Sequence, residues 1–106
     1  MSGYRFVYDQ RLGIPLPELD QDWECYDMKT REKILMEWEK VRGTIPDRIS
    51  CLERQIEEKQ RCLDEEEDFD TSCRLNREIA ELASVINDLW IWYRLTEEVA
   101  PAATHA

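Results

Sequence analysis

Two hydrophobic heptad runs lie in residues 45–93, IPDRISCLERQIEEKQRCLDEEEDFDTSCRLNREIAELASVINDLWIWY. The first run is Ile45, Ile49, Leu52, Ile56, Lys59 and Leu63, and the second is Leu75, Ile79, Leu82, Ile86, Leu89 and Tyr93. Both step by 4, 3, 4, 3 and 4 residues, which keeps one narrow stripe of a helix facing a partner helix. Continuing the first run past Leu63 would place Glu66 and Asp70 on that stripe. The runs therefore predict two antiparallel helices.

A further helix is expected at residues 27–42, before the first heptad run. Asp27 is suited to cap it, because its carboxylate can accept a hydrogen bond from an orphan backbone N–H. Gly43 stands where a left-handed residue commonly ends a helix. Its expected buried face consists of Ile34, Leu35, Trp38 and Val41.

The two heptad helices are expected at residues 45–67 and 71–98. Thr44 is suited to cap the first of them, and Pro46 falls in the first turn, where its missing N–H costs nothing. A short turn around residues 68–71 follows, with Asp70 or Thr71 as the cap of the second helix.

The first 26 residues differ in composition from the rest. Residues 4–8 have strand-like composition, and Pro15 and Pro17 favour extended backbone before them. We expect residues 1–26 to form an extended arm that packs on the helices, and residues 99–106 to form a disordered tail. A short β-ribbon made with another chain is the alternative for the arm. The arm residues expected to be partly buried are Tyr4, Phe6, Tyr8, Ile14 and Leu16.

The expected fold is all-α: a three-helix domain, residues 27–98, built on a long coiled-coil-like antiparallel hairpin. Residues 83–93 are apolar on almost every side of their helix, so a third helix should cover them. Helix 27–42, about 24 Å long, has the matching length and leaves the hairpin tip bare. Core packing is expected for Trp38, Trp90 and Trp92. Ile91 and Trp92 are the alternative surface, for a homodimer or a partner.

Composition narrows the classes of function. The formal net charge is −10, which disfavours nucleic acid and anionic membranes and favours solubility, with a basic protein partner as the functional alternative. Residues 1–20 lack the apolar core of a signal peptide, and no apolar stretch has membrane-spanning length. We therefore expect a cytoplasmic protein with reduced cysteines.

An acidic run is the most unusual polar feature. Its carboxylates fall at the C-terminal end of helix 45–67, where negative charge opposes the helix dipole. The ordinary interpretation of this tip is a solvated turn, and the functional alternative is docking on a basic partner or weak binding of a divalent cation. The predicted partner-binding residues are Asp64, Glu65, Glu66, Glu67, Asp68, Phe69 and Asp70, with Ile91 and Trp92 at the other end of the hairpin.

Catalytic and metal-binding patterns are missing from the sequence. No Ser/His/Asp set, glycine-rich phosphate loop or Cys-x-x-Cys pair is present, and His105 stands alone in the tail. We therefore predict no enzyme activity, no catalytic residues, no metal and no cofactor. Cys62 and Cys73 are nearly symmetric about the turn, so a reversible disulfide across the hairpin is an alternative to two ordinary thiols.

Residues 45–93 resemble the small two-helix aspartyl-phosphate phosphatases of sporulating bacteria in length and heptad pattern. The Ser-x-x-x-Asp motif of that family would fall at Asn76 and Ala80, so both defining residues are absent and no site residue is carried over. The predicted function is therefore a non-catalytic protein–protein interaction module, a small adaptor or regulator that acts through its helical hairpin. A regulator of a phosphorylated signalling protein is the alternative that the resemblance implies.

Overall fold

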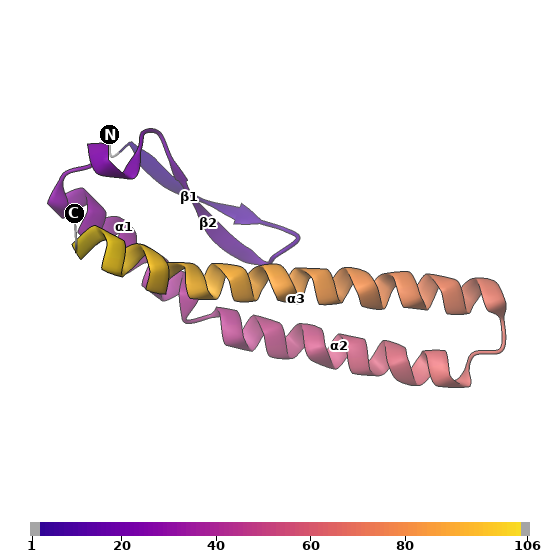
Figure 1. Ribbon diagram of the computed structural model, residues 1–106. Helices are drawn as coiled ribbons and strands as arrows, with labels where there is room; N and C mark the ends of the chain where they lie inside the picture. The colour runs from indigo at the N-terminus through magenta and orange to yellow at the C-terminus, as the bar shows by residue number, and fades with distance from the viewer. Residues whose placement is uncertain (1–2, 105–106) are drawn as a thin grey trace. The chain divides into compact units, whose positions relative to one another are not determined.

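The computed structural model describes residues 3–104, and the side chains of residues 3–95. Helices make up 71% of the chain, and the longest helix is bent (Figure 1). The chain divides into two compact units, Met1–Ile45 and Pro46–Ala106. The elements in order are β1 (Tyr4–Asp9), β2 (Ile14–Leu19), the 3-10 helix η1 (Trp23–Cys25), α1 (Met28–Arg42), α2 (Ile45–Glu65) and α3 (Phe69–Thr104).

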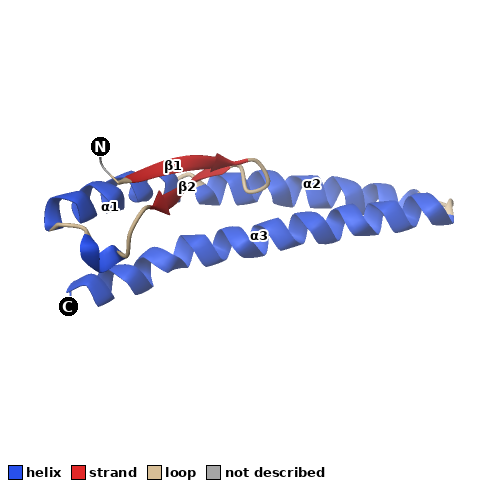
Figure 2. Ribbon diagram, turned by 90° about the horizontal axis from the view of Figure 1, so that it is seen from above, coloured by secondary structure: helices blue, strands red, loops and turns tan. Residues whose placement is uncertain are grey.

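A β-hairpin at the N-terminus corrects the all-α prediction. β1 pairs antiparallel with β2, in a register that runs from Tyr4 opposite Leu19 to Asp9 opposite Ile14 (Figure 2). The carboxylate of Asp9 accepts a hydrogen bond from the Leu12 N–H at 2.8 Å, and Gly13 closes the turn with a positive φ of 77°. The ribbon is thus completed within the chain, whereas the predicted ribbon needed a second chain.

The two prolines of β2 fit this hairpin because they lie at outward-facing backbone positions. The Asp20 N–H donates to the Gly3 carbonyl at 3.0 Å, so the even-numbered residues of β2 point their N–H groups toward β1. Pro15 and Pro17 alternate with them and lack a donor only on the open edge, where proline is tolerated in a sheet.

The hairpin packs within its own unit, where β2 contacts α1. Ile14 is almost fully buried, whereas Tyr8 is 62% exposed and differs from the burial expected for it. The other three apolar arm residues, Tyr4, Phe6 and Leu16, are half-buried.

Tyr26 ties the open end of the hairpin to the segment before α1. Its side chain is buried, and its hydroxyl accepts a hydrogen bond from the Asp20 N–H at 3.0 Å and donates one to the Gly3 carbonyl. One phenol thereby joins the first residue before β1 to the first residue after β2. This role of Tyr26 was not predicted from the sequence.

The caps of α1 match the prediction at one end only. Asp27 caps the N-terminus by accepting from the Thr30 N–H at 3.0 Å. Gly43 has a right-handed φ of −63°, so the expected left-handed C-cap is wrong. The Thr44 hydroxyl donates to the Val41 carbonyl at 2.6 Å, which assigns it to the end of α1. On the expected buried face, Ile34 and Trp38 are buried, and Leu35 and Val41 are half-buried.

The second unit consists of α2 and α3, which run side by side in opposite directions (Figures 1 and 2). α2 ends at Glu65, and α3 begins at Phe69 and continues to Thr104, beyond the end expected at residue 98. Of the predicted tail, residues 105–106 lie outside the described residues. No described helix combines the length and apolarity that a membrane span requires. The buried residues of this unit are Ile49, Leu52, Leu75, Val85 and Leu89.

Candidate functional site

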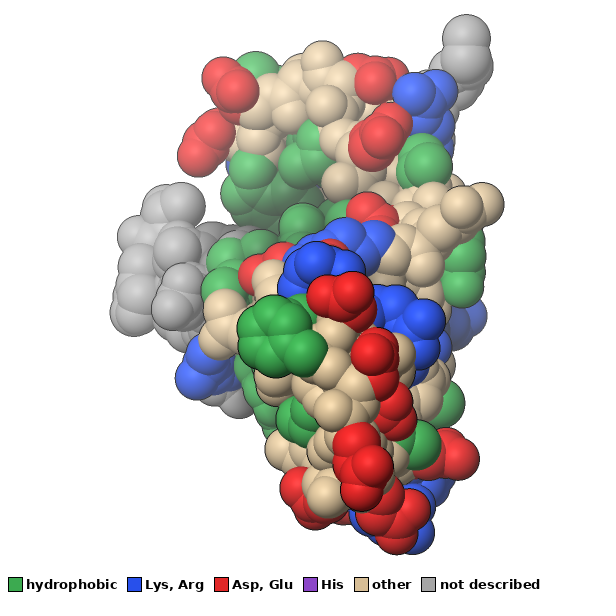
Figure 3. All heavy atoms as spheres, turned by 90° about the vertical axis from the view of Figure 1, so that its right-hand side faces the viewer, with side chains coloured by type: hydrophobic (Ala, Val, Ile, Leu, Met, Phe, Trp, Pro, Cys, Tyr) green, Lys and Arg blue, Asp and Glu red, His purple; other side chains and the backbone are tan. Residues whose placement is uncertain are grey.

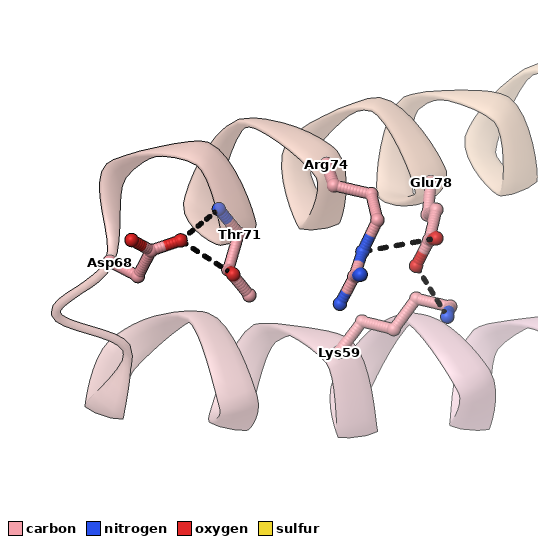
Figure 4. Close-up of polar contacts among 5 residues, drawn as sticks. All are labelled: Lys59, Asp68, Thr71, Arg74 and Glu78. Atoms are coloured by element: carbon pink, nitrogen blue, oxygen red, sulfur yellow. Dashed lines mark hydrogen bonds and ion pairs between the residues drawn. The ribbon is translucent and has the colours of Figure 1, made fainter.

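The tip of the α2–α3 helical hairpin is built around a helix cap at Asp68. Its carboxylate accepts hydrogen bonds from the Thr71 N–H at 2.9 Å and from the Thr71 hydroxyl at 2.7 Å (Figure 4). These two bonds hold the pKa of Asp68 below its ordinary value, with the hydroxyl bond as the larger cause. The cap of α3 is therefore Asp68, and the expectation of Asp70 or Thr71 is wrong, because the helix begins two residues earlier than predicted.

Most of the other carboxylates of the tip are exposed to solvent. Among the described residues they have no hydrogen-bond or ion-pair partner, and the last turn of α2 carries no basic residue. The α2 carbonyl groups that end the helix add partial negative charge at the same place. Figure 3 looks onto this end of the hairpin and shows acidic side chains with a hydrophobic group among them. Four of the five remaining acidic residues are exposed, namely Asp64, Glu65, Glu67 and Asp70, and Glu66 is half-buried.

Phe69 is the exposed aromatic residue of this tip. Its side chain is 78% exposed, the highest value among the large hydrophobic residues that the structure describes. It follows the Asp68 cap directly, so the first turn of α3 fixes its backbone. The tip thus presents an exposed aromatic side chain on a fixed backbone, next to several carboxylates.

The described residues include no group of three or more His, Cys, Asp and Glu side chains placed to hold a metal ion. The acidic tip therefore gives no support to the divalent-cation alternative. Cys62 and Cys73 are free thiols in this structure, with Cys62 exposed and Cys73 half-buried.

A charged contact crosses the hairpin where the first heptad run contains Lys59. The Lys59 ammonium donates to the Glu78 carboxylate at 2.9 Å, and Arg74 approaches the second oxygen of Glu78 at 3.8 Å (Figure 4). The hydrogen bond from Lys59 is the largest cause that lowers the pKa of Glu78. The side chains of Lys59 and Glu78 are 33% and 41% exposed, so the pair is partly solvated and adds little stability.

Acid should destabilise the protein through these carboxylates. Asp27, Asp68 and Glu78 have lowered pKa values, so each stabilises the folded state above its ordinary pKa and loses that contribution as pH falls through its folded pKa. We expect the free energy of unfolding to fall from about pH 5 toward about pH 3 in urea titrations. Asp68→Asn keeps a capping oxygen that does not titrate, so its curve should be shallower. An unchanged slope would contradict the role of Asp68.

The predicted site residues form two separate surfaces. Ile91 is 49% exposed and Trp92 is half-buried. Both lie on α3, 22 and 23 residues after Phe69. At about 1.5 Å per residue this separates them from the tip by about 33 Å. Beside them, Trp90 is 39% exposed and packs edge-to-face on Tyr93, with ring centroids 5.5 Å apart.

A groove lies between α2 and α3 that was not predicted from the sequence. It has a volume of about 400 Å³. The residues that line it are Glu53, Ile56, Glu57, Ala83 and Ile86. The sequence feature that could have indicated it is Ala83, a small residue next to the second heptad run. We refer to these five residues as the α2–α3 groove.

The comparisons with known proteins assign no family. No protein-family model matches the chain, and no curated protein or solved structure matches it either.

Proposed function

We propose that this protein is a non-catalytic protein–protein interaction module, a small cytoplasmic adaptor or regulator that binds a basic protein partner through the tip of its hairpin. The observation that carries the proposal is the 78% exposure of Phe69 beside a helix cap and among carboxylates. An exposed aromatic side chain on a fixed backbone is the kind of residue that can dominate binding energy when a partner buries it. The surrounding carboxylates would steer a basic partner and exclude acidic ones.

The chemistry of the described residues supports a binding role. The three carboxyl groups with shifted pKa values all have lowered values, and each serves a cap or an ion pair. A general acid at neutral pH needs the opposite shift. Asn76 and Ala80, which occupy the phosphatase motif positions, are exposed on α3 and offer an amide and a methyl group. Neither side chain can act as a general base.

A particular packing of the three helices would support this function. We expect α1 to cover the apolar half of α3 and form a three-helix base, so that the two-helix tip projects for binding. The alternative is a homodimer in which Ile91 and Trp92 of two chains meet. The exposed fraction of Ile91, 49%, is the observation that favours this second surface.

The acidic end of α2 should reduce the stability of the protein. Asp64→Lys and Glu65→Lys place positive charge at the helix C-terminus, so each should raise the free energy of unfolding by about 0.3–0.5 kcal/mol. The measurement is urea unfolding followed by circular dichroism. Glu58→Lys is the control, because it makes the same charge change on an exposed position inside the helix. An equal gain for the control would assign the effect to net charge and not to the dipole.

Quantitative affinity capture tests the function. The baits are the wild-type protein, Phe69→Ser, the double variant Asp64→Lys/Glu65→Lys and Met36→Ser, each used in extracts of the cells that naturally produce the protein. Met36 is 64% exposed and lies in the other unit, which makes it a matched surface control. We expect a basic protein that Phe69→Ser and Asp64→Lys/Glu65→Lys lose and Met36→Ser keeps. Equal capture by all baits, or loss of phosphate from a captured phosphoprotein, would contradict the proposal.

A further inference from the structure

The α2–α3 groove is an opening beside the heptad seam of the hairpin. Ile56 and Ile86 occupy heptad positions yet are only half-buried, whereas their seam neighbours Leu52 and Leu89 are buried. Ala83 has a side chain too small to close the space beside Ile86. The floor of the groove is therefore apolar, and it lies between two antiparallel helices, beside a seam like that of a coiled coil.

The rims of the groove differ in charge. Glu53 and Glu57 are exposed on the α2 rim and lie four residues apart, where like charges on a helix repel each other. Neither has a hydrogen-bond or ion-pair partner among residues 3–95, the part of the chain with described side chains. The α3 rim is formed by the neutral Ala83. A cationic group above the α2 rim would remove the repulsion between the two glutamates.

We propose that the α2–α3 groove binds an amphipathic helix of a basic partner. The apolar face of that helix covers Ile56, Ala83 and Ile86, and lysine or arginine side chains along one edge pair with Glu53 and Glu57. The inference rests on the proposed function and deepens it by naming the structural class of the partner. A second copy of the chain fits this groove poorly, because two chains of net charge −10 would repel each other at their acidic rims.

The test uses synthetic helical peptides of about 18 residues, which is about five turns. The probe has leucines on one face and lysines along one edge of that face. One control peptide replaces the lysines with glutamates, and another has the same composition in scrambled order. Amide NMR spectra of the ¹⁵N-labelled full chain, recorded at about 150 mM salt, report where each peptide binds. We expect the lysine peptide to shift the signals of Ile56, Ala83 and Ile86, and both controls to leave them unchanged.

Three variants locate the binding. Glu57→Lys should weaken binding of the lysine peptide about tenfold, whereas Glu58→Lys, an identical charge change on the neighbouring residue, should change it less than about twofold. Ala83→Arg should also weaken binding about tenfold, because the arginine side chain fills the groove and its positive charge repels the lysines of the peptide. Ala83 is exposed, so this variant should keep the circular dichroism spectrum of the parent.

Equal binding of the scrambled peptide, or equal loss in Glu57→Lys and Glu58→Lys, would overturn the groove proposal. So would light scattering that shows a dimer which Ala83→Arg dissociates, because a second copy would then occupy the groove. These failures are separable from failure of the proposed function. If the groove variants have no effect while Phe69→Ser still loses its partner, binding through the tip stands alone.

Discussion

Leu52→Asp is expected to lower the free energy of unfolding by about 3–5 kcal/mol. Leu52 is 3% exposed and occupies a central position of the first heptad run. An aspartate there either buries an unpaired charge or opens the seam to water, and both outcomes remove the apolar contacts of the leucine. The measurement is urea unfolding at neutral pH, followed by the far-ultraviolet circular dichroism of the helices.

Gln55→Asp is the control for this prediction. It adds the same charge to the same helix at an exposed position, so it should change the free energy of unfolding by less than about 0.5 kcal/mol. If Leu52→Asp unfolds at the same urea concentration as Gln55→Asp, the heptad residues of α2 do not form the seam.

Trp38→Ala is expected to cost about 3–5 kcal/mol. Trp38 is 5% exposed on α1, and its removal takes away the largest buried side chain of that helix. In the proposed three-helix base, this loss should destabilise α3 as well as α1. Unfolding should then remain a single cooperative transition at lower urea concentration, with the fluorescence of the remaining tryptophans and the helical signal changing together.

Met36→Ala is the matched control, because Met36 lies on the same helix and is 64% exposed. It should change the free energy of unfolding by less than about 0.5 kcal/mol. Two separate transitions in Trp38→Ala, with the α2–α3 hairpin unfolding as in the parent, would contradict a shared base. The two compact units would then be independent in stability.

The helical part of the fold could be predicted from the sequence because its apolar residues recur with a regular period. The heptad spacing from Ile45 to Tyr93 predicted the two long helices, and the Asp27 cap was visible as an acidic residue before an apolar repeat. Helix ends were harder, since several residues near each end could serve as the cap. Asp68, Asp70 and Thr71 all have suitable side chains, and only the three-dimensional turn selects Asp68.

The β-hairpin was missed because only residues 4–8 had strand-like composition, and the segment with Pro15 and Pro17 was expected to be extended without being recognised as their partner strand. The tolerance of Pro15 and Pro17 depends on which edge of β2 faces β1, and that is a property of the pairing register. The Lys59–Glu78 contact was hidden for a similar reason. Lys59 appeared as a defect in its own run, and its partner lies on the other helix, 19 residues away.

The candidate site was predictable in part. Composition marked the acidic tip, but not which of its residues caps a helix and which remain available to a partner. The α2–α3 groove depends on the size of one side chain, Ala83, relative to its heptad neighbours. Such a space follows from how two helices pack, so a single-helix pattern does not reveal it.

Photo-crosslinking from position 69 tests the central proposal most directly. A photoreactive phenylalanine analogue replaces Phe69 in one variant and Met36 in another, each in the cells that naturally produce the protein. We predict a discrete covalent adduct with a basic protein from position 69, lost when Asp64 and Glu65 are changed to lysine. No such adduct from position 36 is expected. The same adducts from both positions, or none from position 69, would contradict a partner-binding tip.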